Sequence, residues 1–185
     1  DKPQYWAALS AGTPLANLPN WPNVLRAKVI RNFGSYLVAI NLTDNSVSKP
    51  HKVLISHKAE PGSVPTSWDD TDPTVDATSF ELTDIQGGEL FDGLGLGSNF
   101  IFYKKNSTHI MRFVGGADLW GLDRLFENSG ILTTRCVCSF KEGTMHFVVT
   151  QNDIISHAGT KDVEKVAEGM NKDAIFAEID PITYV

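Results

Sequence analysis

The chain lacks the features that define several common protein classes. Its 185 residues include only two cysteines, and 22 Asp and Glu outnumber 16 Lys and Arg, which gives a net charge of −6. No apolar run approaches the roughly 20 residues of a membrane-spanning helix. Nucleic-acid-binding domains normally carry a basic patch, so the acidic balance argues against that class. The first residues, 1–6, contain neither an initiator Met nor a basic leader followed by an apolar one, so we expect no signal peptide and a piece of a longer chain.

The two cysteines, Cys136 and Cys138, are separated by one residue. On a strand, residues i and i+2 share a face and their side chains run parallel, which is a poor geometry for a disulfide. A metal pair would need two further ligands at a matching spacing, and the sequence shows none. We therefore expect two small buried hydrophobic residues.

Signatures of catalysis are also missing from the sequence. It contains no Gly-x-Ser-x-Gly elbow, no His-x-x-x-His pair and no Gly-rich phosphate loop with Lys. Two Ser-His dipeptides occur, at 56–57 and 156–157, but neighbours on a strand point to opposite faces and cannot form the Ser–His bond of a triad. The sequence predicts a non-enzymatic protein with no catalytic, cofactor-binding or metal residues.

Short β-forming runs are what the chain has in abundance. They are rich in Val, Ile, Phe, Tyr and Thr and are bounded by Gly, Asn, Asp or Ser, as strands are. The pattern predicts an all-β fold, and the expected strands are 27–33, 36–42, 52–56, 99–103, 109–114, 134–140, 145–150 and 153–157.

A turn motif recurs along these runs. Gly34-Ser35, Gly97-Ser98 and Gly143-Thr144 each precede an apolar run, at spacings of 63 and 46 residues. Glycine supplies the positive φ of a tight hairpin, and blade periods of about 40 to 50 residues are typical of β-propellers. We therefore expect antiparallel blade-like units of a partial β-propeller. A sandwich or a Greek-key barrel is the alternative.

The expected organisation has three parts. Residues 1–26 form a loop-rich segment with frequent prolines, in which Trp6 and Trp21 are interpreted as aromatic anchors. Blades follow over 27–160, with a long insertion at 58–79. Residues 161–185 hold a short helix and the start of a further blade, because apolar residues recur at i, i+3, i+4 and i+7 within 161–175.

The insertion contains an acidic pattern. Oxygen-bearing side chains stand at positions 1, 3, 5, 7, 9 and 12 of a possible calcium loop: Asp70, Asp72, Thr74, Asp76, Thr78 and Glu81. Position 6, which should be Gly, is Val75, and position 4 is Pro73. We favour a solvated turn in which Asp side chains cap backbone amides, and calcium binding is the alternative.

The same insertion carries one large apolar side chain, Trp68. Three prolines in the loop 60–76 restrict the unfolded chain and indicate a held shape rather than a flexible tether. We expect the loop to serve packing or assembly, with Trp68 buried as its anchor.

The order of segments resembles that of one protein family. The stretches that carry the likeness are LPNWP at 18–22, RAKVIRNF at 26–33, YLVAI at 36–40, PHKV at 50–53, PGSVPTSWD at 61–69, GL at 93–94, IFYK at 101–104, MRFVGG at 111–116 and DIISHAG at 153–159. As an ordered set they resemble the tail nozzle, or tubular tail hub, proteins of short-tailed, podovirus-type bacteriophages. The resemblance covers residues 18–180.

The resemblance implies a structural virion component with a β-propeller, made in the host cytoplasm. Family members form a homohexameric ring below the adaptor and portal, next to tail fibre or spike proteins, and DNA passes the lumen without specific binding. The family supplies no catalytic residues and no cofactor. An acidic chain suits such a conduit, because a basic lumen would hold the phosphates.

Two other classes stay open. A carbohydrate-binding or glycoside-cleaving propeller would need a pair of carboxylates roughly 5 to 10 Å apart, for which Asp69, Asp72 and Glu89 are candidates. An unrelated β-sandwich interaction module is the third class.

Overall fold

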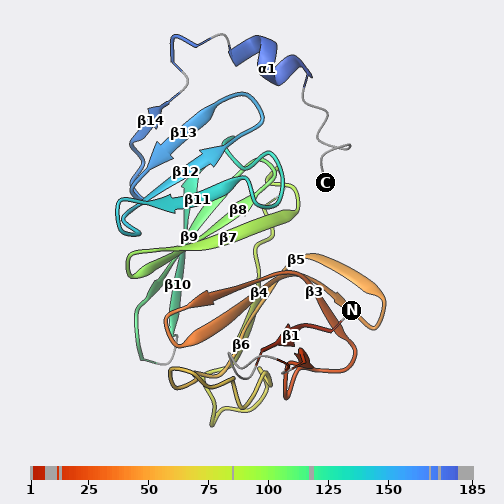
Figure 1. The fold of residues 1–185 in the computed structure, drawn as a ribbon. Coiled ribbons are helices and arrows are strands. Elements are labelled where there is room, and N and C mark those ends of the chain that lie inside the picture. The colour runs from red at the N-terminus through yellow and green to blue at the C-terminus, as the bar shows by residue number, and fades with distance from the viewer. Residues whose placement is uncertain are drawn as a thin grey trace. The chain divides into compact units, whose positions relative to one another are not determined.

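The computed structural model describes residues 2–6, 12, 14–84, 86–116, 119–166, 168–170 and 172–178. Over these residues the protein is nearly all β, with one short helix, α1 (Lys172–Glu178) (Figure 1). The chain divides into two compact units, Asp1–Leu82 and Thr83–Val185. No helix among the described residues is long and apolar enough to cross a membrane.

The unit Asp1–Leu82 contains one four-stranded sheet and one small ribbon. The sheet has the order β3-β4-β5-β6, so each strand pairs antiparallel with the next one along the chain. The ribbon pairs β1 with β2. Their bounds are β1 (Gln4–Tyr5), β2 (Ala16–Asn17), β3 (Leu25–Phe33), β4 (Tyr36–Asp44), β5 (Val47–Ile55) and β6 (Thr78–Glu81).

The unit Thr83–Val185 contains two further sheets of the same kind. Their orders are β10-β9-β8-β7 and β11-β12-β13-β14, again up and down along the chain (Figure 1). The bounds are β7 (Leu90–Leu96), β8 (Asn99–Lys104), β9 (Thr108–Phe113), β10 (Trp120–Phe126), β11 (Val137–Phe140), β12 (Met145–Val149), β13 (Ile154–His157) and β14 (Val163–Lys165).

The recurring glycines occupy equivalent places in the three sheets. Gly34, Gly97 and Gly143 lie between the first and second strand of their sheets, with φ of 55°, 57° and 82°. Side chains favour negative φ, so these hairpins need glycine. Three antiparallel up-and-down sheets with equivalent first turns confirm the expected blade-like units.

The fourth strand of each sheet and β7 were not among the expected strands. β6, β10 and β14 are edge strands, and Val163–Lys165 is exposed throughout. Edge strands bury little, so their alternation is weak. The expected short C-terminal helix is present as α1, but the position predicted for it within 161–175 is corrected, because β14 occupies part of that range and α1 begins only at Lys172. The expected start of a further blade beyond 178 lies outside the described residues.

Pro50 lies inside a strand, although the expected strand 52–56 begins only after it. β5 begins at Val47, and its pairing with β4 shifts register between Ile40 and Leu42. The shift is a bulge opposite Asn41, whose φ is 57°. A bulge leaves ladder positions unpaired, so the missing N–H of proline is tolerated there.

Two indole rings lie in the core of the first unit. Trp68 is 3% exposed and meets Trp21 edge-on, with ring centroids 4.7 Å apart. Both rings belong to one cluster with residues of β3, β4 and β5, among them Ala39 and Leu54. The burial of Trp68 and the anchoring role of Trp21 agree with the sequence prediction. Trp6 is 53% exposed, so its interpretation as an anchor was wrong.

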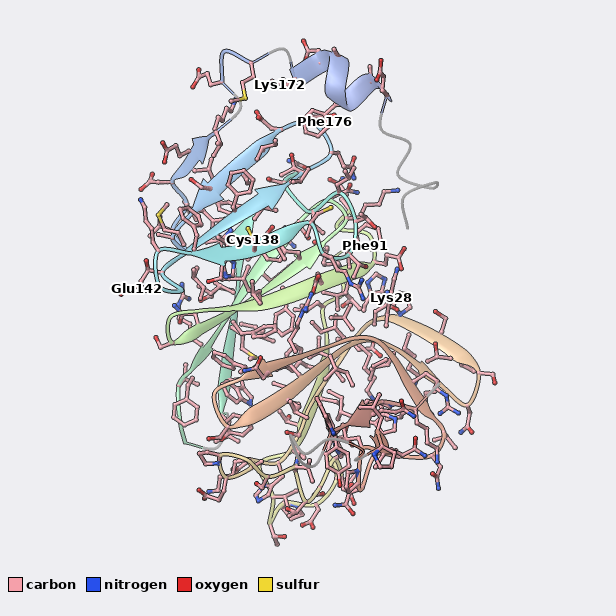
Figure 2. All side chains as sticks on the ribbon, viewed as in Figure 1. Lys28, Phe91, Cys138, Glu142, Lys172 and Phe176 are labelled. Carbon is pink, nitrogen blue, oxygen red and sulfur yellow. The ribbon has the colours of Figure 1, made fainter. Side chains whose placement is uncertain are left out.

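The core of the second unit lies between its two sheets. It joins Leu96, Ile101, Tyr103, Ile110, Leu125, Ile131, Val148 and Ile155. Cys136 packs against this core and is partly buried, whereas Cys138 on β11 is exposed (Figure 2). The expectation of two buried cysteines was therefore wrong for Cys138, because it lies on the face of β11 opposite Val137, which packs on the core.

Candidate functional site

A buried chain of hydrogen bonds joins the two sheets of the second unit. The hydroxyl of Tyr103 on β8 lies 2.8 Å from His146 Nδ1 and 2.8 Å from His157 Nε2. His146 and His157 face each other across β12 and β13. The chain ends on backbone, because His146 Nε2 lies 2.8 Å from the Gly95 carbonyl and the Gly159 N–H donates to His157 Nδ1 at 3.2 Å.

The backbone groups at the two ends determine where every proton lies. The Gly95 carbonyl can only accept, so His146 Nε2 carries the proton and His146 Nδ1 accepts from the Tyr103 hydroxyl. The Gly159 N–H can only donate, so His157 Nδ1 accepts and His157 Nε2–H donates to Tyr103. Each donor then meets one acceptor, with both rings neutral.

Burial keeps these rings neutral. His146 is 0% exposed and His157 is 1% exposed. Burial lowers the pKa of His146, while the Gly95 carbonyl opposes the shift. Burial, followed by the neighbouring His146, lowers the pKa of His157 to about 4. Burial raises the pKa of Tyr103 well above its usual range. The three groups are therefore uncharged at neutral pH and hold the sheets together by neutral hydrogen bonds.

Asp84 lies at the centre of a second polar cluster in the same unit. It bonds the ammonium of Lys104, which is 0% exposed, and accepts from Ser107 Oγ at 2.6 Å. Burial alone would raise the pKa of Asp84, but the bonds from Lys104 and Ser107 and the lysine charge lower it to about 2. His109 lies 3.5 Å from the carboxylate, and burial lowers its pKa.

This cluster brings together Ser, His and Asp without the geometry of a catalytic triad. In a triad the serine hydroxyl donates to one ring nitrogen and the aspartate holds the other. Here the Ser107 hydroxyl donates to Asp84, and both Ser107 Oγ (3.3 Å) and Asp84 Oδ2 (3.5 Å) lie near the same nitrogen, His109 Nε2. The aspartate and the lysine neutralise each other, which indicates a structural ion pair.

A polar cavity of about 440 Å³ lies beside Asp84 and Ser107. Asn106 closes one side, with its Nδ2 donating to the Gln86 carbonyl at 2.9 Å. Arg124 Nη1 lies 3.4 Å from Glu127 Oε1 at the rim. The charged groups that line the cavity are paired, so it has the character of a neutral, hydrogen-bonding surface.

The acidic pattern in the first unit forms turns. Asp72 Oδ1 accepts from the Thr74 N–H at 2.9 Å and from its hydroxyl at 2.7 Å, and Asp70 accepts from Ser79 Oγ. The bond from the Thr74 N–H to Asp72 is the capping arrangement that the sequence favoured, whereas Asp70 bonds a side chain of β6 instead of a backbone amide.

The other members of the pattern have different surroundings. Asp76 lies 3.7 Å from Lys58 Nζ and donates its backbone N–H to His57, while Glu81 ends β6. Within the described part of the chain, no group of three or more His, Cys, Asp or Glu side chains could hold a metal ion.

The carboxylates considered for sugar chemistry lie in both units. Asp69 Oδ1 accepts from the Thr71 N–H at 3.0 Å and Asp72 caps Thr74, so both of these carboxylates stabilise turns in the first unit. Glu89 belongs to the second unit and directly precedes β7.

The Tyr103–His146–His157 chain was not foreseen from the sequence. The sequence marked His157 only as part of the Ser156-His157 dipeptide. In the structure the Ser156 hydroxyl lies 3.4 Å from a Glu164 carboxylate oxygen. A usable signal exists: His146 and His157 flank one short hairpin and fall on the same face as Val148 and Ile155. Their partner Tyr103 is 43 residues away from His146, beyond the reach of local pattern.

Comparison with protein-family models gives no match, and no curated protein shows significant similarity to the chain.

Proposed function

We propose that the chain is part of a subunit of the tail nozzle ring of a short-tailed bacteriophage, a structural virion component that forms the conduit for DNA ejection. The observation that carries the proposal is the succession of three up-and-down four-stranded sheets with equivalent Gly turns. It supports the propeller that the ordered segments of the resemblance imply.

The polar clusters of the second unit agree with a structural role. The Tyr103–His146–His157 chain bonds one sheet to the other, and Asp84 bonds Lys104 within the same unit. Satisfied buried polar networks rigidify a fold and specify one packing of its elements. A rigid subunit suits a ring through which DNA passes under force.

In this proposal the partners are further copies of the subunit, the adaptor or portal-proximal proteins above, and tail fibre or spike proteins beside the ring. The net charge of −6 supports passage of DNA without specific binding, because phosphates are not attracted to an acidic wall.

Electron microscopy of the full-length protein, together with light scattering in solution, tests the proposal. We expect a ring with a central channel, of a mass that corresponds to about six subunits. A monomer that hydrolyses or binds host surface polysaccharide would contradict the proposal and favour the carbohydrate-active alternative.

A further inference from the structure

We propose that the Tyr103–His146–His157 chain is an acid-sensitive lock between the two sheets of the second unit. Three of its hydrogen bonds cross from one sheet to the other: His146 to Gly95, Tyr103 to His146, and His157 to Tyr103. All three are 2.8 Å long. These hydrogen bonds therefore join the same two sheets that the surrounding apolar core joins.

Each imidazole has one acceptor nitrogen, and both are in use. His146 Nδ1 accepts a hydrogen bond from the Tyr103 hydroxyl, and His157 Nδ1 accepts one from the Gly159 N–H. A proton that binds His157 Nδ1 turns it into a donor that faces the Gly159 N–H, and a proton that binds His146 Nδ1 forces the Tyr103 hydroxyl to accept there instead of donating. Protonation of His157 thus removes the bond from Gly159, protonation of His146 leaves the Tyr103 hydroxyl proton without its acceptor, and either event adds a buried cation.

Within the part of the chain that the structure describes, no carboxylate bonds either ring and could stabilise this cation. From β7 comes Asp92, whose two oxygens accept the N–H groups of Gly93 and Arg135 at 2.8 Å each. From β10 comes the ring of Phe126, which lies edge-on to His157 at 5.2 Å, and the segment before β11 contributes Cys136 to the adjoining core.

The elements that carry the lock add no counter-charge. β8 contributes the neutral Tyr103, and β12 and β13 contribute the two rings themselves, with centroids 5.7 Å apart. Two cations at that distance repel each other. A proton on either ring is therefore opposed by burial and by the other ring once that is charged.

Lowering the pH therefore destabilises the folded state of the second unit. The pKa of His157 is about 4 in the folded chain and about 6.5 for an unfolded histidine, so the unfolded state binds more protons between these values. The contribution of the lock is complete above about pH 6.5 and is lost as the pH falls toward 4. His157 alone then lowers the folding equilibrium constant of the second unit about a hundredfold between pH 7 and pH 4.

Hydrogen exchange of backbone amides in β8, β12 and β13, measured on the whole chain at pH 7, 6, 5 and 4.5 and corrected for intrinsic rates, tests the lock. We expect protection to fall steeply in the wild type and to fall much less in His157→Gln, which keeps a donor but does not titrate in this range. His57→Gln, in the first unit, is the matched control and should keep the wild-type slope. Equal slopes in the wild type and His157→Gln would overturn the proposal.

The nitrogen chemical shifts of the wild-type rings give a second test that needs no variant. We expect both His146 and His157 to be neutral Nε2–H tautomers at pH 7. A charged ring or an Nδ1–H tautomer at either position would overturn the proposal, even if His157→Gln failed to fold.

Discussion

In the unit Asp1–Leu82 the core packed on the sheet is built around two indole rings, whereas in the unit Thr83–Val185 a second sheet covers the first and is bonded to it through Tyr103, His146 and His157. The strands follow the same order in both units. Burial of indoles is non-directional and independent of pH. A hydrogen-bond chain needs one arrangement of protons, so it specifies how two sheets meet and depends on pH.

The largest expected effect is on the first unit. Trp68→Ala should destabilise it by about 4 kcal/mol, because truncation of a buried aromatic side chain leaves a cavity. Urea denaturation followed by hydrogen exchange resolves the two units. Trp6→Ala is the matched control, since Trp6 is exposed, and should change stability by less than about 0.5 kcal/mol. Equal effects of the two substitutions on stability would refute the anchoring role of Trp68.

The next effect is on the second unit. Tyr103→Phe keeps the ring but removes the hydroxyl, which leaves the acceptor of His146 and the donor of His157 unpaired. Each unpaired buried group costs about 1 to 3 kcal/mol, so we expect a loss of about 3 kcal/mol in this unit. Tyr5→Phe, in the first unit, is the control. A Tyr103→Phe variant as stable as the wild type would show that the chain contributes nothing.

The third prediction compares the stability cost of an alanine at one turn glycine in each unit. Gly34 has φ of 55° and no atom near the position of a Cβ, so Gly34→Ala should cost only the backbone strain of about 1 kcal/mol. Gly159 has φ of 77°, and a Cβ there would lie 2.8 Å from Leu96 Cδ2. We expect Gly159→Ala to cost about 2 kcal/mol because it adds a clash and displaces the N–H that His157 accepts. Thermal unfolding measures both, and the reverse order would contradict the contacts at Gly159.

The smallest effect concerns the acidic loop of the first unit. Asp72→Asn keeps an oxygen that can accept from Thr74, so stability should change by less than about 0.5 kcal/mol. Chelator should leave the protease cleavage pattern of the loop unchanged. Faster cleavage with chelator, combined with a large effect of Asp70→Asn, would instead support the calcium interpretation.

The sequence predicted most strands, including the edge strands β3 and β11, and it missed β7 and the fourth strand of each sheet. β4 and β8 were expected within two residues of their bounds, because Gly34 and Gly97 mark their starts and their side chains are strongly apolar. β10 and β14 were missed because they are largely exposed and show little apolar alternation, whereas β7 was missed although most of it is buried.

The candidate site was the least predictable part. The anchor Trp68 could be expected because a single large apolar side chain in a long loop has few alternatives to burial. The Asp84–Lys104 pair and the Tyr103–His146–His157 chain could not be expected in this way. Their members are polar residues that read as surface positions, and burial became acceptable only because each found a partner.

The sequence by itself determined the local conformations: short runs rich in β-branched and aromatic residues made strands, and Gly34, Gly97 and Gly143 made the first hairpin of each sheet. These depend on steric preferences within a few residues. Only the tertiary structure decided that Tyr103 meets two histidines, and with them the position of each proton in the chain. That outcome depends on the packing of two sheets across more than 40 residues of sequence, and local preferences carry no information about contacts of that separation.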